Sequence, residues 1–352
     1  MLDEGELFDR GVVRARAPLR LGFAGGGTDV SPFLDDHGGA VLNATIGMYA
    51  YASIEPRHDG RVLFEICETQ ATTDFPMDAV PDEIAGFALH LGAYRRVIRD
   101  FRGGRPMGLN LRTHCDAPAG SGLGSSSTLM VAMITAFKEL LLLPLGDYEV
   151  AHLAFEVERL DLGLTGGKQD QYAAAFGGVN FMEFLARDRV IVNPLRVKPA
   201  ILAELEASLV LYYTGQSRSS AAILHQQVHN MRASPDAMEA ALELKADAFT
   251  IKEALLKGDI RAFGAVLNKS WAAKKRMAEQ ITNDALDAVN DVAFGAGAYA
   301  GKVSGAGGGG FMMFIGEPSR RPSLTAALQA RGGLAFTPHF VERGAEAWRR
   351  PR

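Results

Sequence analysis

Cysteine is nearly absent from this sequence. The 352 residues include two cysteines, Cys67 and Cys115, and neither belongs to a Cys-x-x-Cys pair. Two isolated thiols cannot build a disulfide framework, so a reducing compartment is the simplest expectation. The first residues, MLDEGE, lack the basic and apolar stretches of a secretion signal. No apolar run approaches the about 18–20 residues that a membrane span requires. Together these absences predict a cytoplasmic protein with no part in the membrane.

An excess of charge of either sign is also missing. The formal net charge is −4 and the chain has no extended basic block, so nothing selects for nucleic acid or a membrane surface as a partner. Hydrophobic residues make up 47% and charged residues 22%, which is typical of a folded globular protein. At roughly 100–200 residues per domain, the length indicates two domains.

Glycine, in contrast, is abundant. Many of the 39 glycines fall in three clusters, at residues 22–27, 120–124 and 305–310. Such clusters mark backbone that turns sharply or lies against a ligand. The first half of the chain mixes strand and helix patterns, and the second half is richer in helix patterns. This contrast predicts an α+β fold with two domains, residues 12–195 and 196–352, divided where prolines concentrate.

Hydrophobic periodicity and the positions of glycine and proline predict the individual elements. Strands are expected at residues 12–24, 39–55, 61–68, 108–114, 179–184, 209–213, 311–315 and 335–341, with Val303 also in strand. Helices are expected at residues 84–101, 126–143, 148–161, 169–176, 219–231, 236–256, 260–268, 284–294 and 323–331.

The second cluster has the composition of a phosphate-binding loop. Residues 118–127 follow a strand pattern and precede a long apolar helix pattern. A helix start offers unpaired N–H groups to anions, preceding glycines let the backbone surround phosphates, and serine hydroxyls bind Mg²⁺. A plain turn capped by Ser125 is the alternative. No lysine follows the glycines as a P-loop requires, and Ser125 stands where the dinucleotide fingerprint needs glycine.

The third cluster, residues 305–310, matches the spacing of the dinucleotide fingerprint. It leads into residues 311–315, however, which have the pattern of a strand, whereas the fingerprint must open a helix. This difference disfavours an NAD-dependent oxidoreductase. The cluster is better interpreted as a second backbone wall beside phosphates or substrate, with a tight β-turn as the alternative.

Two acidic residues near the clusters are candidates for metal binding and catalysis. On the expected helix 148–161, Glu158 lies on the apolar side, opposite a polar stripe that ends at Arg159. A carboxylate on an apolar face needs a metal ion or a cationic side chain as its partner, and both interpretations stay open. Asp170 stands at a helix start preceded by glycines, where a simple N-terminal cap is the alternative.

Taken in order, the three clusters resemble the three motifs of the GHMP kinase superfamily. The first motif covers residues 17–29, the second residues 118–127 and the third residues 302–309, and the resemblance extends over nearly the whole chain. It implies an ATP-dependent kinase that uses Mg²⁺. It also implies a two-domain fold, with an N-terminal domain like ribosomal protein S5 domain 2 and a ferredoxin-like C-terminal domain with extra helices.

The resemblance implies roles for individual residues. Asp170 matches the acid that orients or deprotonates the acceptor hydroxyl, and Arg20 matches a basic residue near the transferred phosphoryl group. Ser126 and Glu158 match the ligands of Mg²⁺, and Asp29 matches an acceptor of sugar hydroxyls. The ATP phosphates are expected at Pro118, Gly120, Ser121, Gly122, Leu123, Gly124, Ser125 and Ser126. The sugar is expected at Gly26, Gly27, Thr28, Asp29, Lys168, Gln169, Arg218 and Gly307.

Residues 22–29 and 166–172 are similar to the heptose kinase branch of this superfamily. That branch phosphorylates the anomeric hydroxyl of a heptose 7-phosphate, on the way to GDP-heptose for surface polysaccharide. Where galactokinases carry Glu-His, this chain has Gly26 and Gly27, which leave room for a longer sugar. The resemblance thus implies a sugar phosphate and ATP as small-molecule partners, with Arg218 and Lys302 as candidate cations for the substrate phosphate. A homodimer is left open.

Three alternatives stand beside this interpretation. The acceptor could be another sugar such as L-fucose. The same fold also carries ATP-dependent decarboxylases, which the sugar-type loop at residues 25–29 disfavours. A non-catalytic sugar sensor is the third, and it has no need of the acids Asp170 and Glu158 that this chain retains.

Overall fold

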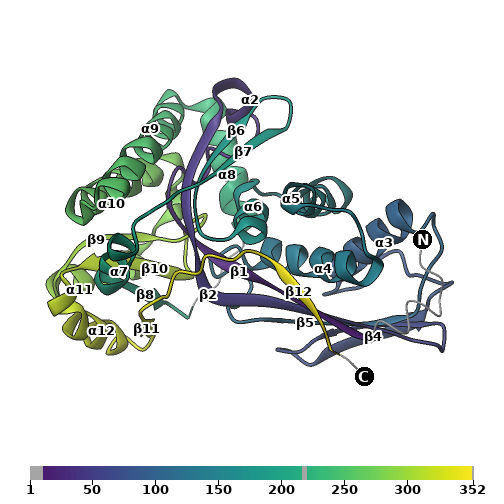
Figure 1. The fold of residues 1–352 in the computed structure, drawn as a ribbon. Helices are drawn as coiled ribbons and strands as arrows, with labels where there is room; N and C mark the ends of the chain where they lie inside the picture. The colour runs from purple at the N-terminus through teal and green to yellow at the C-terminus, as the bar shows by residue number, and fades with distance from the viewer. Residues whose placement is uncertain (1–10, 216–219, 351–352) are drawn as a thin grey trace.

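The computed structural model describes residues 11–215 and 220–350, which form two sheets with helices packed against them (Figure 1). The strands are β1 Val12–Ala24, β2 Gly39–Pro56, β3 Arg61–Ile66, β4 Ala71–Pro76, β5 Leu109–Cys115, β6 Val179–Leu185, β7 Arg189–Pro194, β8 Leu209–Tyr213, β9 Ala298–Val303, β10 Phe311–Gly316, β11 Leu334–Phe336 and β12 Glu346–Arg350. The α-helices are α2 Phe33–His37, α3 Ala88–Phe101, α4 Ser125–Leu141, α5 Asp147–Glu156, α6 Gln169–Phe176, α7 Pro199–Ser208, α8 Ser220–Ala233, α9 Pro235–Lys257, α10 Ile260–Met277, α11 Asp284–Gly295 and α12 Arg321–Gln329.

The first sheet is built around β2, which is long enough to pair with two strands in succession. Its residues 39–44 pair with β6 and its residues 50–56 pair with β5, both antiparallel. β1 runs antiparallel along the other edge of β2. The full order is β12-β1-β2-β5-β3-β4; in addition, β6 pairs with β2, and β7 pairs with β6. Because β12 pairs with β1, the end of the chain returns to the sheet of the first half.

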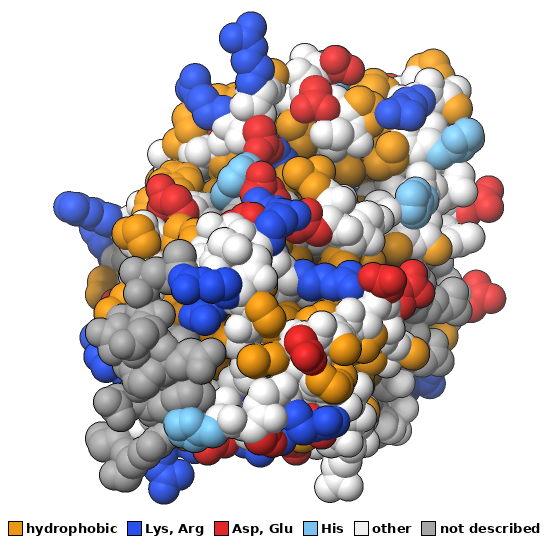
Figure 2. Space-filling view, turned by 90° about the vertical axis from the view of Figure 1, so that its right-hand side faces the viewer, with side chains coloured by type: hydrophobic (Ala, Val, Ile, Leu, Met, Phe, Trp, Pro, Cys, Tyr) orange, Lys and Arg blue, Asp and Glu red, His pale blue; other side chains and the backbone are white. Residues whose placement is uncertain are grey.

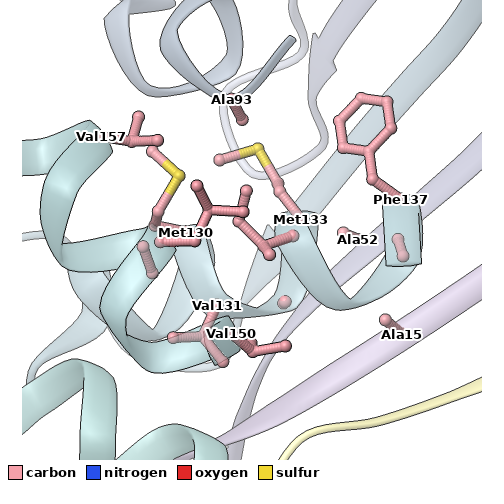
Figure 3. Close-up of a cluster of buried hydrophobic side chains, with 14 of the residues drawn as sticks. Ala15, Ala52, Ala93, Met130, Val131, Met133, Phe137, Val150 and Val157 are labelled. Atoms are coloured by element: carbon pink, nitrogen blue, oxygen red, sulfur yellow. The ribbon is translucent and has the colours of Figure 1, made fainter. Parts of the chain in front are cut away.

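Helix α4 occupies the centre of the first half. Its sequence is almost continuously apolar, and it is buried between the sheet and neighbouring helices. Figure 3 shows Met130, Met133 and Phe137 of α4 in one cluster with Ala52 of β2 and Val157. Each buried side chain of this size contributes roughly 1.5–3 kcal/mol to folding. This packing fixes the start of α4, where the second glycine cluster lies, relative to β1 and β2.

The second sheet has the order β11-β8-β10-β9, with antiparallel neighbours throughout. In chain order within this half, the strands lie fourth, first, third, second, which is the ferredoxin-like arrangement. Helices cover both faces of the sheet, so every residue of β10 is buried. Met313 of β10 belongs to the apolar cluster beneath α9 and α10, and Phe314 belongs to the cluster with α11 and α12. The expected α+β fold, with a ferredoxin-like half and extra helices, is confirmed.

The structure adds elements that the sequence patterns did not reveal. These are the strands β4, β7 and β12 and the helices α2 and α7, while α10 is longer than expected and the last expected strand is shorter. β12 in particular pairs with the first strand of the chain, and no local pattern reports such a distant partner. The domain boundary between residues 195 and 196 stays a prediction. The structure shows in addition that β12, residues 346–350, belongs to the first sheet.

The molecular surface carries both signs of charge. On the face shown in Figure 2, basic and acidic side chains are interspersed among apolar and neutral ones. Within residues 11–215 and 220–350, no helix combines the length and the apolar character that crossing a bilayer would require.

Candidate active site

All three glycine clusters contribute to the wall of one cavity, whose volume is about 280 Å³. Their residues in the wall are Gly22, Gly25, Gly26, Gly27, Gly120, Gly122, Gly124, Gly305 and Ala306. Charged side chains from distant parts of the chain line the same space, namely Arg20, Asp29, Glu158, Arg159, Asp170, Lys274 and Lys302. Helices α8 and α10 supply further residues of the wall, among them Leu224 and Ser270.

The second cluster ends at the start of α4, as a phosphate loop requires. Gly124 occupies the N-cap position in the left-handed conformation, and no side chain caps the helix. The first N–H groups of α4 therefore suit an anion, and the helix dipole favours negative charge there. Ser125 is not the cap, because its hydroxyl donates to the carbonyl of Pro118 at 3.3 Å. The alternative of a turn capped by Ser125 is therefore not what the structure shows.

Gly122 joins the second cluster to the third. A Cβ atom at this position would lie 2.4 Å from the carbonyl oxygen of Ser304, and its φ angle is +83°. The carbonyl of Gly122 accepts hydrogen bonds from Arg20 Nη1 at 2.7 Å and from Ser304 Oγ at 2.9 Å. Glycine alone combines this conformation with such a close backbone approach. The third cluster is thus a backbone wall against the phosphate loop.

Replacing Gly122 by alanine is expected to distort the phosphate loop. We expect the stability to fall by about 1–3 kcal/mol, because left-handed strain adds to a clash with backbone atoms, and ATP to bind about tenfold more weakly or worse. Gly86→Ala is the matched control, since its φ is +80° and nothing lies within 4 Å of its Cβ. Denaturant unfolding and ATP titration of both variants measure the difference. Equal effects would show that the contact with Ser304 does not shape the loop.

Asp170 lies against the end of the phosphate loop. Its Oδ1 accepts a hydrogen bond from Arg20 Nε at 2.8 Å and lies 2.7 Å from Arg20 Nη2 in an ion pair, and Arg20 is buried. A Cβ on Gly124 would come within 3.0 Å of the Asp170 Cγ atom. The carboxylate of Asp170 makes no cap for α6, whose N-cap position is Lys168. The cap alternative therefore fails, and Asp170 is held by Arg20 beside the expected position of the phosphates.

Asp29 performs the capping that Asp170 does not. Its Oδ2 accepts the backbone N–H groups of Lys168 and Gln169, each at 3.0 Å, at the start of α6. Its Oδ1 accepts the N–H of Gly27 at 3.1 Å and the side-chain amide of Gln169 at 3.2 Å. A carboxylate has about four acceptor sites, so these four bonds use its capacity. Asp29 therefore fixes the first glycine cluster to the helix that carries Asp170, and its contact with a sugar stays a prediction.

Glu158 and Ser126 meet across the cavity wall. Glu158 is fully buried, and its Oε1 accepts a hydrogen bond from Ser126 Oγ at 3.1 Å. Its Oε2 accepts one from Gln171 Nε2 at 2.6 Å. Among residues 11–215 and 220–350, the nearest cation is Arg159, with Nη1 at 3.8 Å from Oε1. A buried carboxylate beside a hydroxyl is an oxygen donor set of the kind that Mg²⁺ prefers.

Glu158 and its neighbour Arg159 lie in a π-helical turn, Val157–Asp161, and both line the cavity. The sequence pattern assumes a regular helix over residues 148–161 and places Arg159 on a polar stripe opposite Glu158. The structure has a wider turn after α5 instead. Arg159 instead lines the cavity, where its Nη2 lies 3.4 Å from both Ser127 Oγ and the carbonyl of Gly167. π-turns of this kind are frequent at functional sites.

Several residues expected in the site do not line the cavity: Pro118, Ser121, Leu123, Thr28, Lys168 and Gly307. The Thr28 hydroxyl is turned into the backbone, where it donates to the carbonyl of Gly25. The Lys168 ammonium pairs with Asp188 and lies over the ring of Phe155, so it does not point at a ligand in the cavity. Arg218 lies outside the described residues.

Lys274 is a site residue that the sequence did not reveal. It stands in α10 between an alanine and two further basic residues, Lys275 and Arg276, and nothing in this pattern separates it from them. In the structure its ammonium is buried in the cavity wall, 2.6 Å from the carbonyl oxygen of Gly26. Lys302, expected as a phosphate cation, lines the same cavity.

The fold and the cavity together define a phosphotransferase that acts on a small molecule. An uncapped helix start suits the phosphates of a nucleotide. Asp170, which is paired with Arg20, lies beside this helix start. The hydroxyl of Ser126 and the buried carboxylate of Glu158 add a group of oxygen donors. These are the parts that phosphoryl transfer requires, namely positioning groups and groups that stabilise charge.

Comparison with known proteins specifies the class. The family model for the N-terminal domain of GHMP kinases matches residues 88–178, and the model for their C-terminal domain matches residues 251–333. A D-glycero-alpha-D-manno-heptose 7-phosphate kinase of Campylobacter jejuni is 43% identical over 96% of this chain and 99% of its own length. The chain therefore belongs to the GHMP kinase family, and the prediction of an ATP-dependent kinase is confirmed.

Solved structures agree. The crystal structure of a D-glycero-D-manno-heptose 1-phosphate kinase from Bacteroides thetaiotaomicron is 47% identical, with a TM-score of 0.81 over 96% of this chain and 98% of that one. A galactokinase from Lactococcus lactis, solved with galactose, is 19% identical with a TM-score of 0.74 over 97% of both chains, and so shares the fold.

Proposed function

We propose that this protein transfers the γ-phosphoryl group of ATP to the anomeric hydroxyl of D-glycero-D-manno-heptose 7-phosphate, giving the 1,7-bisphosphate and ADP. The full-length similarity to the Campylobacter jejuni enzyme is the observation that carries the choice of sugar. The name of the Bacteroides relative places the phosphate at position 1 instead, so the two names agree on a heptose phosphate and differ in its position. The product would supply GDP-heptose for surface polysaccharide.

The residues of the cavity support an in-line transfer. The anomeric oxygen forms a bond to the γ-phosphorus while the bond from that phosphorus to the β-phosphate oxygen breaks. Asp170, which Arg20 holds against the phosphate loop, orients the hydroxyl and accepts its proton. The start of α4 binds the ATP phosphates, and Arg20 offers positive charge beside them.

Mg²⁺ is part of this proposal. Ser126 and Glu158 fit it, because their oxygens lie 3.1 Å apart and the buried carboxylate has no cation closer than 3.8 Å among the described residues. Mg²⁺ takes few protein ligands and completes its shell with phosphate oxygens and water. When bound, it would neutralise charge on the ATP phosphates. A cytoplasmic location and a homodimer remain predictions.

The test is ADP release over a panel of acceptors, with and without Mg²⁺. We expect D-glycero-D-manno-heptose 7-phosphate to be the preferred acceptor, with turnover that depends on Mg²⁺. Phosphorus NMR of the product should show a new phosphate attached at the anomeric position. Heptose 1-phosphate and L-fucose are the informative competitors. If heptose 1-phosphate alone is turned over, the acceptor hydroxyl is not the anomeric one but another hydroxyl of the sugar. Preference for L-fucose would favour the kinase activity named for a Bacteroides fragilis relative that is 26% identical over 88% of this chain.

A further inference from the structure

Two buried lysines in the cavity wall have no acidic partner. Lys274 of α10 and Lys302 of β9 are 5% and 9% exposed. Among the described residues, neither ammonium forms an ion pair. Burying a charge without a partner is unfavourable, so the fold maintains two such groups at a place where a ligand can reach them.

Each ammonium keeps a donor for that ligand. Lys274 Nζ donates to the carbonyl of Gly26 at 2.6 Å and to Gln227 Oε1 at 3.2 Å. Lys302 Nζ donates to the carbonyls of Gly22 at 3.0 Å and Phe23 at 3.2 Å. Because a protonated lysine has three donors, one N–H of each remains for the cavity.

The acids of the cavity wall are bonded to groups other than these lysines. Asp170 is paired with Arg20, and the oxygens of Asp29 accept four N–H groups. Burial lowers the pKa of Lys274 to about 8, an effect that Asp29 opposes and Arg20 increases. Burial, with Lys274 and Arg20 nearby, lowers the pKa of Lys302 to about 7. With both lysines protonated, the four basic side chains of the wall outnumber its three acidic ones, so the wall suits an anion.

The position of Lys274 separates it from the loop that suits the ATP phosphates. Arg20 donates a hydrogen bond to the carbonyl of Gly122 in that loop. Ser304, two residues after Lys302, donates to the same Gly122 carbonyl. Lys274, in contrast, donates hydrogen bonds to the first glycine cluster and to α8. Ser270, one turn earlier on α10, lines the cavity beside it. The cations therefore extend from the phosphate loop towards α8 and α10.

We propose that Lys274, with Lys302 beside it, binds the phosphate that the acceptor already carries, and so makes the enzyme selective for a phosphorylated sugar. This inference rests on the proposed function. The competing source of phosphate is the γ-phosphoryl group of ATP, which every acceptor would share. A comparison of heptose 7-phosphate with unphosphorylated heptose therefore separates the two sources.

The experiment measures kcat/KM for both acceptors with the wild-type enzyme, Lys274→Met and Lys302→Met. A charge-assisted hydrogen bond to phosphate corresponds to about 10- to 100-fold in binding. We expect a loss of that size for heptose 7-phosphate and a much smaller loss for heptose, so that the preference for the phosphorylated sugar collapses. Lys269→Met is the matched control, because Lys269 lies on the same helix and pairs with Asp247 outside the cavity. It should leave the preference unchanged.

A second measurement needs no variant. Calorimetric titration at pH 8 in two buffers of different ionisation enthalpy reports protons taken up on binding. A dianion raises the pKa of both lysines, so heptose 7-phosphate should bind with uptake of roughly one proton or slightly more, and heptose with none. Equal losses for both acceptors in the lysine variants, or equal proton uptake, would overturn the inference. If the wild-type enzyme does not phosphorylate heptose 7-phosphate, the proposed function itself is overturned.

Discussion

Asp170→Asn is expected to lower kcat by about 10²–10⁴-fold, the usual range for a general base or positioning acid. The amide cannot accept the proton of the acceptor hydroxyl, although it has nearly the same shape as the carboxylate. ATP should bind almost as before, because its expected contacts are with the start of α4 and with the loop around Gly122 and Gly124. Steady-state turnover of heptose 7-phosphate, together with ATP titration in the absence of acceptor, measures both quantities.

The control for this variant is Asp188→Asn. Asp188 also pairs with a cation, Lys168, but lies outside the cavity wall, so turnover should stay near the wild-type value. The two variants together separate the loss of any ion pair from the loss of this particular carboxylate. A loss below about tenfold for Asp170→Asn would reduce Asp170 to a structural partner of Arg20.

Local pattern was sufficient for much of the fold and for the loop that suits ATP. A strand pattern, the glycines of residues 118–127 and an apolar helix pattern follow one another in the chain. Their order predicts a helix start that binds an anion. The packing of α4 in the core then follows from its composition. The pairing of Ser126 with Glu158 was also within reach, since Ser126 belongs to the second motif and Glu158 stands out as an acid on the apolar side of its helix.

Contacts between distant segments were beyond the sequence. The sequence did not reveal that the oxygens of Asp29 accept N–H groups from the start of α6, which only the folded chain brings near. Arg159 depends on a π-helical turn that periodicity does not reveal. Lys274 lies 248 residues along the chain from Gly26, whose carbonyl it bonds. Such residues are found through burial and electrostatics, because a lysine without an acid is unusual only when it is buried.

Gly26→Glu is expected to lower kcat/KM for heptose 7-phosphate by about 100-fold or more, while ATP affinity stays nearly unchanged. Gly26 lines the cavity, and a Cβ at this position would be 3.6 Å from Gln169 Nε2, which is an ordinary contact. A glutamate can therefore be accommodated by the backbone, and its carboxylate enters the space of the acceptor. That carboxylate also lies near Lys274, where it would repel a substrate phosphate, and like charges brought together cost several kcal/mol.

Two further substitutions at the same residue separate backbone, shape and charge. Gly26→Ala adds a methyl group that makes only ordinary contacts, so both affinities should change by less than about fourfold, since one methyl group corresponds to about 0.8 kcal/mol. Gly26→Gln fills the same space as glutamate without its charge. If glutamine acts like glutamate, shape alone excludes the sugar; if it acts like alanine, repulsion of the phosphate does. Sugar affinity that glutamate leaves unchanged would mean that the acceptor does not pass residue 26, and that the missing side chains at Gly26 and Gly27 do not explain the choice of sugar.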